Sequence, residues 1–235
     1  MIATNPATRM TKYYKQAPVV HDEIQPLTED EVRLFFRTGL KYSPQYYPLF
    51  LCAIHTGLRS SELAGLQWGD VDFNSKFIVV RRQFVRGIVQ QTKTDKIRRV
   101  DLSDDLLNVL KELKRQRREQ WLAKGRNTNP EWVFCNRDGN MIDMHNLKNR
   151  HFYKCLEKAG LRRIRFHDLR HTFATLLLQN GESLAYVKDQ LGHSSIRMTV
   201  DVYGQLVPSA NRQAVNKLPS LDKADPIELP LQGQQ

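Results

Sequence analysis

Apolar positions recur at helical spacing through most of the chain. Leucine, phenylalanine and valine return every three or four positions in several segments, which indicates helices with one buried face. We expect these helices at about residues 28–39, 44–55, 60–66, 103–118, 147–160, 167–180, 183–192 and 194–204. The expected N-caps are Thr28, Ser60 or Ser61, Ser103, Ser183, and Ser194 or Ser195. Gly57 is placed to end the second helix in a left-handed conformation.

Between the third and fourth of these helices the pattern becomes that of strands. β-branched and aromatic residues alternate with polar ones over residues 77–80, 84–85, 88–89 and 100–102. Gly87 and the polar run 92–96 are suited to turns, which would place Lys93 at a hairpin tip. A second hairpin is expected around the turn at residues 137–140. The fold class we predict is α+β, mainly α-helical with a small antiparallel β-sheet.

Composition narrows the class of partner. The 235 residues are 40% hydrophobic and 26% charged, as in ordinary globular proteins, and the formal net charge is +11. That charge favours a polyanionic partner such as nucleic acid, although basicity alone does not identify it. Apolar runs are too short to cross a bilayer and no signal segment opens the chain, so we expect a cytoplasmic protein without a membrane partner. The three cysteines lack metal-binding spacing, and we expect them to be reduced and structural.

Several residues form a set suited to a phosphodiester. His167 and Arg170 lie three positions apart at the start of an expected helix, and His193 and Tyr203 follow. Arg59 lies far upstream, at an expected helix N-terminus where free N–H groups favour an anion. Each residue alone has an ordinary explanation; Arg59, for example, could pair with Glu62 or Asp70. Together they supply cations, proton carriers and a nucleophile.

In order and spacing these residues resemble the tyrosine recombinase, or phage integrase, family. The similarity is densest over residues 166–203, which read HDLRHTFAT, then LGHSS, then TVDVY. TGLRSSEL at 56–63 and Thr92-Lys93-Thr94 extend it, so that it covers about residues 27–207. The resemblance implies the tyrosine recombinase catalytic-domain fold. It also implies site-specific cutting and rejoining of DNA through a 3′-phosphotyrosyl intermediate, as in integration and excision of mobile DNA.

The resemblance implies a role for each matching residue. Tyr203 would attack the scissile phosphate, Arg59 and Arg170 would clamp its oxygens, and Lys93 would protonate the leaving 5′-oxygen. His167 would orient the site or accept a proton, His193 would bind the phosphate, and Glu62 would support Arg59. Lys96 is a lower-ranked rival of Lys93. No metal or other cofactor is expected, because no acidic or Cys/His cluster and no glycine-rich phosphate loop is present in the sequence.

The expected partners are double-stranded DNA and further protomers on it, in a tetrameric synapse of the full-length protein, with the enzyme at the nucleoid when it acts. Candidate DNA contacts outside the site are Arg162, Arg163, Arg165, Lys114, Arg115 and Arg118. The basic run among them also fits a solvated helix face. Two other functions use the same features: nicking and resealing like a type IB topoisomerase, and DNA binding by a regulator without catalysis. The LGHSS–tyrosine pattern and its short spacing from Arg170 argue against the first function, and the intact residue set argues against the second.

We expect residues 1–26 to form an N-terminal arm or linker and residues 27–207 the catalytic domain. Residues 208–235 are expected to form either a poorly ordered tail or a segment that docks in trans on a neighbouring protomer. Members of the family normally carry a helical core-binding domain that clamps DNA before the catalytic one. Met1 stands almost at the corresponding linker, so that core-binding domain is expected to be absent from this chain. Salt-sensitive, largely non-specific DNA binding should remain.

Overall fold

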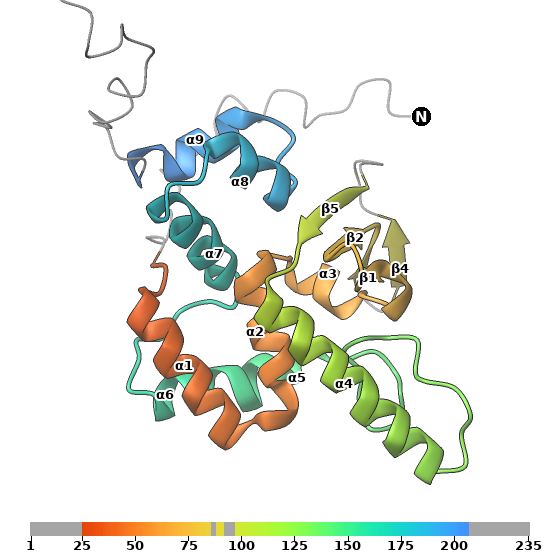
Figure 1. Ribbon diagram of the computed structural model, residues 1–235. Helices are drawn as coiled ribbons and strands as arrows, with labels where there is room; N and C mark the ends of the chain where they lie inside the picture. The colour runs from red at the N-terminus through yellow and green to blue at the C-terminus, as the bar shows by residue number, and fades with distance from the viewer. Residues whose placement is uncertain (1–24, 86–87, 92–96, 207–235) are drawn as a thin grey trace, which may run out of the picture.

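The computed structural model describes residues 25–85, 88–91 and 97–206, and it is mainly helical, as the periodicity predicts (Figure 1). The α-helices are α1 (Glu29–Tyr42), α2 (Tyr47–Thr56), α3 (Ser60–Ala64), α4 (Asp104–Ala123), α5 (Met144–Leu147), α6 (Tyr153–Lys158), α7 (Asp168–Gln179), α8 (Leu184–Leu191) and α9 (Ile196–Tyr203). A π-helical segment, η4 (Lys148–Phe152), joins α5 to α6. Short 3-10 turns are η2 (Pro44–Tyr46), η3 (Trp68–Asp70) and η5 (Gly204–Leu206).

The strands form two small antiparallel sheets instead of the single expected one. The strands are β1 (Val71–Asp72), β2 (Phe77–Val80), β3 (Arg82–Val85), β4 (Ile88–Gln91) and β5 (Arg98–Asp101). One sheet has the order β1-β2-β5, with Ile78 opposite Val100, and the other pairs β3 with β4. Only Arg81 separates β2 from β3, so β3 leaves the first sheet without a hairpin turn and pairs with β4.

The strands on either side of the Lys93 segment are not paired with each other. β4 pairs with β3, whereas β5 pairs with β2. Lys93 and Lys96 themselves lie outside the described residues. What the structure does place is Arg98, the first residue of β5, five positions after Lys93.

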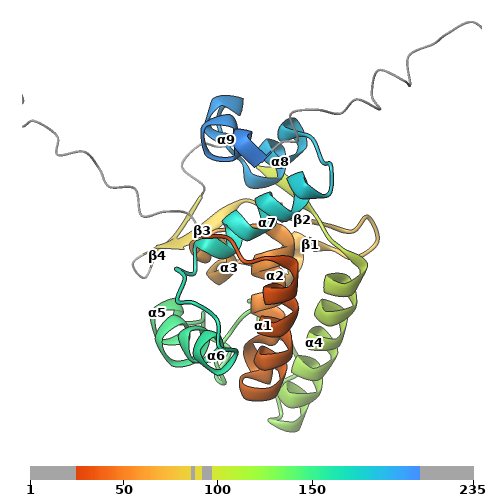
Figure 2. The same cartoon turned by 90° about the vertical axis from the view of Figure 1, so that its left-hand side faces the viewer.

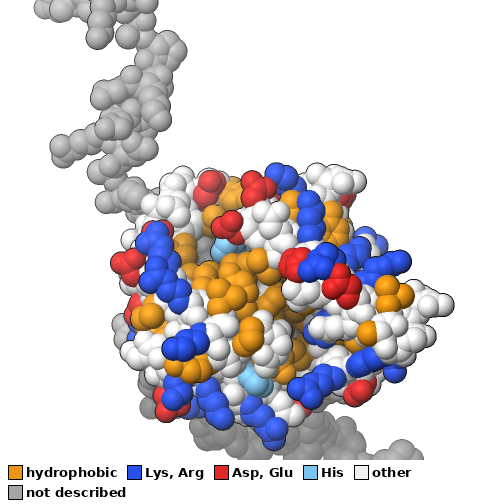
Figure 3. Space-filling view, turned by 60° about the horizontal axis from the view of Figure 1, so that its bottom comes forward, with side chains coloured by type: hydrophobic (Ala, Val, Ile, Leu, Met, Phe, Trp, Pro, Cys, Tyr) orange, Lys and Arg blue, Asp and Glu red, His pale blue; other side chains and the backbone are white. Residues whose placement is uncertain are grey.

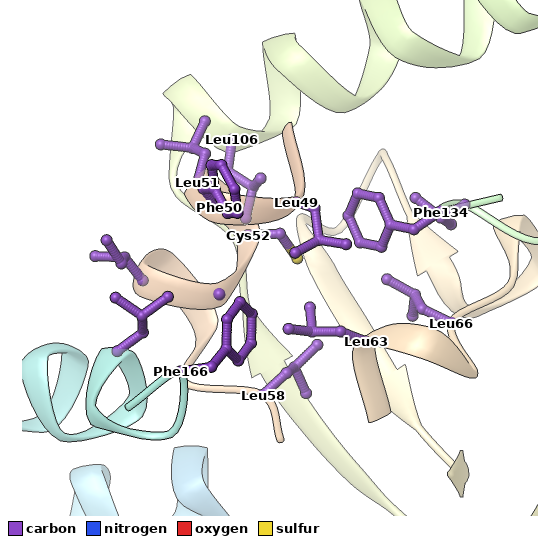
Figure 4. Close-up of a cluster of buried hydrophobic side chains, with 14 of the residues drawn as sticks. Leu49, Phe50, Leu51, Cys52, Leu58, Leu63, Leu66, Leu106, Phe134 and Phe166 are labelled. Atoms are coloured by element: carbon purple, nitrogen blue, oxygen red, sulfur yellow. The ribbon is translucent and has the colours of Figure 1, made fainter. Parts of the chain in front are cut away.

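The hydrophobic core is built around α2. This helix is apolar on every side, from Leu49 to Ile54, and is therefore buried on every side. Leu63 of α3, Leu106 of α4 and Phe166 pack around it (Figure 4). A second, smaller cluster joins α7, α8 and the end of α9. The second cluster contains residues of the catalytic motifs, so the core positions the candidate site directly.

Side-chain caps begin several helices as the sequence predicts. The N–H of Glu31 donates to Thr28 Oγ1 and the N–H of Thr28 donates to the Glu31 carboxylate, which completes the expected capping box. Ser103 and Ser183 accept backbone N–H bonds at the starts of α4 and α8. These bonds satisfy N–H groups that have no partner within the helix.

One of the expected helix starts is wrong. α3 begins after Arg59, and neither serine at 60–61 is the N-cap, because the Glu62 carboxylate accepts the backbone N–H of Arg59. The N-cap of α9 is Ser195, one of the two serines expected there, but the Ser195 side chain makes no capping bond. Ser194 instead donates its hydroxyl to a methionine sulfur one turn further on. For α3, the sequence alone did not distinguish Arg59 from the two serines that follow it.

The turn at residues 137–140 is present, but it does not join two strands. Single β-bridges link Cys135 with Met141 and Gln67 with Trp132. One bridge joins this loop region to the residue before η3, and the other joins the two sides of the turn. The sequence therefore correctly indicated a chain reversal, but it overestimated the strand pairing.

The predicted catalytic-domain boundary near residue 27 coincides with a packed residue. Leu27 is buried, and its N–H donates to Thr172 Oγ1 of α7 at 2.9 Å. Residues 1–24 of the expected arm and residues 208–235 of the expected tail lie outside the described residues.

The helices divide into two groups around the sheets. α7, α8 and α9 lie together at one end, and α1, α4 and α6 extend toward the other (Figures 1 and 2). On the face at the lower end of Figure 1, apolar side chains gather at the centre and lysine and arginine side chains surround them (Figure 3). Positive charge is thus present around the apolar centre of this face. Among the residues described, no helix has both the length and the apolar character needed to cross a membrane.

We predict that Phe35→Ala lowers the free energy of unfolding by about 3–5 kcal/mol, because a fully buried ring leaves a cavity. Phe35 of α1 has no exposed surface and packs against Phe50 and Phe152. The matched control is Leu34→Ala on the same helix, where Leu34 is exposed and the change should stay within about 0.5 kcal/mol. Denaturant unfolding measures both, and equal losses would contradict the assigned core.

Candidate active site

Arg170 lies buried in the first turn of α7 and connects two other turns of the chain. Its Nη1 donates to the carbonyl of Gly57 at 2.7 Å, and its Nη2 donates to the carbonyl of Leu191 at 2.6 Å. Gly57 ends α2 two positions before Arg59, and Leu191 ends α8 two positions before His193. A guanidinium has further N–H donors beyond these two. Arg170 therefore fixes both turns while it keeps donors for an anion.

Glycine is required in both of these turns. Gly57 has φ +59°, and a Cβ there would lie 2.5 Å from Cδ1 of Phe173. Gly192 has φ +68°, and a Cβ there would lie 2.6 Å from Cδ of Arg98. A left-handed backbone and a close neighbour both exclude larger residues. The glycines of the TGLR and LGH motifs thus allow the end of α2 to pack against Phe173 and the end of α8 to pack against Arg98.

Arg59 is supported by a buried carboxylate, as expected. Its Nη1 donates to Oε1 of Glu62 at 2.9 Å, and its backbone N–H donates to Oε2 at 2.8 Å. The Arg59 side chain retains 38% of its surface exposed, whereas that of Glu62 retains 2%. Asp70, the other partner considered, pairs with Arg81 and Arg82. The guanidinium of Arg59 is therefore held from behind and faces outward, available to a ligand.

Arg98 is a residue of the site that sequence reasoning missed. It donates from Nη1 and Nη2 to the two oxygens of Glu62, at 2.9 and 2.8 Å, which is a bidentate ion pair. Its Nε donates to the backbone carbonyl of Gln190 at 3.1 Å. Alternation along β5 places Arg98 on the same face as the buried Val100, and this was the available signal. Arg98 thus links the residue that supports Arg59 to the end of α8.

Further bonds join β5 to α8. The Gln190 side chain accepts from the N–H of Asp101 at 2.9 Å and donates to the Asp101 carboxylate at 3.1 Å. The hydroxyl of Tyr186 donates to the same carboxylate at 2.8 Å. The strand that follows the Lys93 segment is consequently fixed to the helix that precedes His193.

Tyr203, the expected nucleophile, is the last residue of α9 and is 2% exposed. Its Oη lies 2.6 Å from Nδ1 of His171, and the two rings have centroids 5.7 Å apart. His171 follows Arg170 in α7 and had no role in the sequence analysis, although it lies within the HDLRH motif. Burial raises the pKa of Tyr203 to about 12, against the opposing charge of Arg170.

His167 lies beside His171 at the start of α7. It is the exposed N-cap of α7, and its ring stands edge-on to that of His171, with centroids 5.2 Å apart and planes at 84°. The described structure gives Tyr203 a hydrogen bond with His171 and none with His167. The histidine that contacts Tyr203 is therefore His171, which lies one helical turn after His167.

His193 lies at the turn after α8, where positive charges surround it. Its Nδ1 is 2.9 Å from Oγ1 of Thr199. Burial, and then the charges of Arg170, Arg59 and Arg98, lower the pKa of His193 to about 4. The ring is therefore neutral at pH 7. In the tautomer whose Nδ1 accepts the threonine hydroxyl, Nε2–H can donate to a phosphate oxygen.

Five of the six expected catalytic residues fall within the described chain, and the structure brings them to one end of α7. Arg170 acts electrostatically on both His193 and Tyr203, and Arg59 acts on Arg170. Burial and the Arg59 charge lower the pKa of Arg170 to about 9, so it stays a cation at pH 7. The sixth residue, Lys93, is outside the described residues. Converging guanidinium groups in a partly buried site are suited to an oxyanion.

Among the candidate DNA contacts outside the site, Arg165 lies near it, because its charge acts on His167 and His171. Arg115, Arg162 and Arg165 form ion pairs with neighbouring carboxylates. Lys114 lies over the rings of Trp68 and Phe73, and Arg163 lies over that of Tyr153. Arg118 lies with Lys114 and Arg115 on α4, which points away from α7–α9 (Figures 1 and 2). Their contact with DNA stays a prediction.

The described residues contain no group of three or more His, Cys, Asp or Glu side chains that could hold a metal ion. Cys52, Cys135 and Cys155 are free and buried, in agreement with the structural role expected for them. Burial raises the pKa of each thiol, which disfavours the reactive thiolate.

We predict that Glu62→Gln lowers the stability of the fold at pH 7 by on the order of 3 kcal/mol. Burial alone would raise the pKa of Glu62, but the hydrogen bonds and charges of Arg98 and Arg59 lower it to about 2. The stabilisation is therefore complete above the unfolded-state pKa of about 4.3 and is lost as the pH falls toward 2.

Denaturant unfolding of wild type and variant between pH 7 and pH 3 measures this difference. Glu112→Gln is the matched control, because Glu112 pairs with Arg115 on the exposed face of α4. The gap between wild type and Glu62→Gln should narrow as the pH falls. A gap independent of pH would show that the charge of Glu62 is not the source of the stability.

Comparison with protein families matches residues 25–209 to the phage integrase family. The chain is 33% identical, over 94% of its length, to a tyrosine recombinase XerC-like protein of Caldanaerobacter subterraneus subsp. tengcongensis, and 31% identical, over 92%, to the ICEBs1 integrase of Bacillus subtilis. It spans 61% and 65% of the lengths of these relatives.

The fold also matches solved structures. The Tn1549 transposon integrase, solved in complex with a circular intermediate DNA, superposes with a TM-score of 0.70 at 21% identity, over 86% of this chain and 68% of that one. The fold predicted from the sequence motifs, that of the tyrosine recombinase catalytic domain, is therefore confirmed. The family match extends over most of the chain and includes every motif that carried the resemblance, so the chain belongs to the phage integrase family, the tyrosine recombinases.

Proposed function

We propose that this chain is the catalytic part of a site-specific DNA recombinase or integrase. It would cut and rejoin DNA through a 3′-phosphotyrosyl intermediate, without metal or ATP, in the integration or excision of mobile DNA. The observation that carries the proposal is that the charges of Arg59 and Arg170 both act on His193, and that of Arg170 also acts on Tyr203, in a member of this family. The names of its relatives, a tyrosine recombinase and an integrase, support it.

The proposed chemistry follows from the charges. Arg59 and Arg170 bind the non-bridging oxygens and oppose the negative charge that develops in the transition state. His193 donates a hydrogen bond to the same phosphate, and Tyr203 attacks phosphorus. Lys93 is proposed to protonate the departing 5′-oxygen, and His167, exposed at the start of α7, to orient the reacting groups. Religation needs no ATP, because the phosphotyrosyl bond retains the energy of the phosphodiester.

The partner we propose is double-stranded DNA, as in the complex of the transposon integrase that shares the fold. Further protomers would assemble with it as a tetramer on the DNA. Because the chain spans less than two thirds of the two relatives described above, assembly is a property we assign to the full-length protein. We further propose a cytoplasmic location, at the nucleoid during recombination.

Covalent capture on DNA tests the proposal. A nicked duplex that carries the target site traps the cleaved product, and we predict a protein–DNA adduct that resists denaturation and forms in EDTA. Tyr203→Phe should abolish the adduct and leave DNA binding unchanged, because it removes only the attacking oxygen.

Tyr186→Phe is the matched control, since the Tyr186 hydroxyl bonds Asp101 and not the proposed reacting groups. An adduct that persists in Tyr203→Phe would reject Tyr203 as the nucleophile. Dependence on a divalent metal would reject the proposed chemistry as a whole.

A separate prediction concerns residues 208–235, which we propose to dock on a neighbouring protomer. Removal of this segment should weaken self-association on DNA, measured by sedimentation or native gels, while cleavage of the nicked substrate by single protomers continues. Unchanged assembly after removal would reject the docking role.

A further inference from the structure

The hydrogen bond between Tyr203 Oη and His171 Nδ1 places a proton acceptor directly on the proposed nucleophile. We propose that His171, and not His167, is the catalytic residue that accepts the proton of Tyr203 as it attacks phosphorus. This inference rests on the proposed function, because it requires Tyr203 to be the nucleophile.

Geometry favours His171 in two ways. At 2.6 Å the O···N distance is that of a short hydrogen bond, within the range over which a general base must reach its proton. His171 also lies within α7, directly after Arg170, so the acceptor and a phosphate-binding cation share one rigid helix. His167 contacts the His171 ring edge-on and can carry the proton onward toward solvent.

Burial and the charges around His171 keep its ring neutral at pH 7, so that Nδ1 has a lone pair for the tyrosine proton. The groups that face it are Tyr203 from α9, and Arg165, His167, Asp168 and Arg170 from α7 and the segment before it. Burial, and then the neighbouring His167 and the two arginines, lower the pKa of His171 to about 4. The carboxylate of Asp168 acts in the opposite direction. His171 is thus neutral at pH 7, and Asp168 stabilises the imidazolium once it forms.

The step balances within the site. The O–H bond of Tyr203 breaks as its proton bonds to Nδ1 of His171, and the freed oxygen lone pair forms the new bond to phosphorus. The bond from phosphorus to the 5′-oxygen breaks with its electron pair on that oxygen, which takes a proton from Lys93 in the proposed mechanism. Religation reverses each transfer, so the imidazolium of His171 returns the proton to Tyr203.

His171→Asn tests the inference, because asparagine offers a hydrogen-bond acceptor near the position of Nδ1 but cannot take the proton. Its cleavage rate on the nicked duplex should fall about 10²- to 10⁴-fold at pH 7. The residual rate should rise about tenfold per pH unit, because attack then depends on ionised tyrosine, whose pKa is far above neutrality. The wild-type rate should change much less over the same range.

A fluorinated tyrosine at position 203 provides a readout that a structural role would not change. Its phenol is more acidic, so it should restore much of the rate lost in His171→Asn and change the wild-type rate little. His167→Asn is the matched control on the same helix and should respond weakly to the fluorinated tyrosine. Thermal unfolding and DNA binding verify that each variant is folded.

The outcomes separate this inference from the function on which it rests. Absence of a Tyr203-dependent adduct in the wild type would contradict the proposed function, and the inference with it. A normal adduct with an unchanged rate in His171→Asn would overturn the inference alone. A loss in His167→Asn that the fluorinated tyrosine rescues, without such rescue in His171→Asn, would assign the proton to His167. A steep dependence of the wild-type rate on phenol acidity would equally contradict a base at His171.

Discussion

The two hydrogen bonds of buried Arg170 to the carbonyls of Gly57 and Leu191 are the constraint on which the site depends. A buried guanidinium is costly unless its donors are paired, and here the partners are the ends of two helices. The backbone segments that lead to Arg59 and His193 are thereby held on either side of one cation. Arg170, one of the two arginines expected to bind the phosphate, thus also holds the turns around it in place. A single residue of α7 therefore positions the segments that carry Arg59 and His193.

The electrostatic balance of the site favours an anion. Arg59, Arg98 and Arg170 lie near one another, and the buried carboxylate of Glu62 pairs with the first two. Repulsion from Arg59 adds to burial in lowering the pKa of Arg170. A phosphate diester placed between Arg59 and Arg170 would relieve this repulsion. Neutral histidines and a tyrosine of raised pKa surround the cations, so the resting site holds an unionised nucleophile and concentrates its positive charge where a phosphate would bind.

Sequence patterns predicted the helices well and the local details less well. The periodicity around Leu49 to Ile54 correctly indicated a central helix, and Gly57 was identified as its left-handed end. Sheet pairing was less predictable, because whether residues 92–96 join paired neighbours depends on contacts distant in sequence. Most of the candidate site followed from residue types at recognisable spacing. Arg98 and His171 did not, because their importance lies in what they contact: an arginine in a strand and a second histidine on a helix each have many ordinary roles.

The central claim is that Arg59 and Arg170 act on the negative charge of the scissile phosphate. Arg59 tests it most cleanly, since it is partly exposed and its loss leaves the Arg98–Glu62 ion pair in place. The measurement is the cleavage rate of Arg59→Met and wild type on two nicked duplexes, one with a normal phosphate and one with an uncharged methylphosphonate at the cleaved position. The account predicts a loss of about 10²- to 10³-fold on the phosphate and a much smaller loss on the methylphosphonate. Equal losses on both would contradict it.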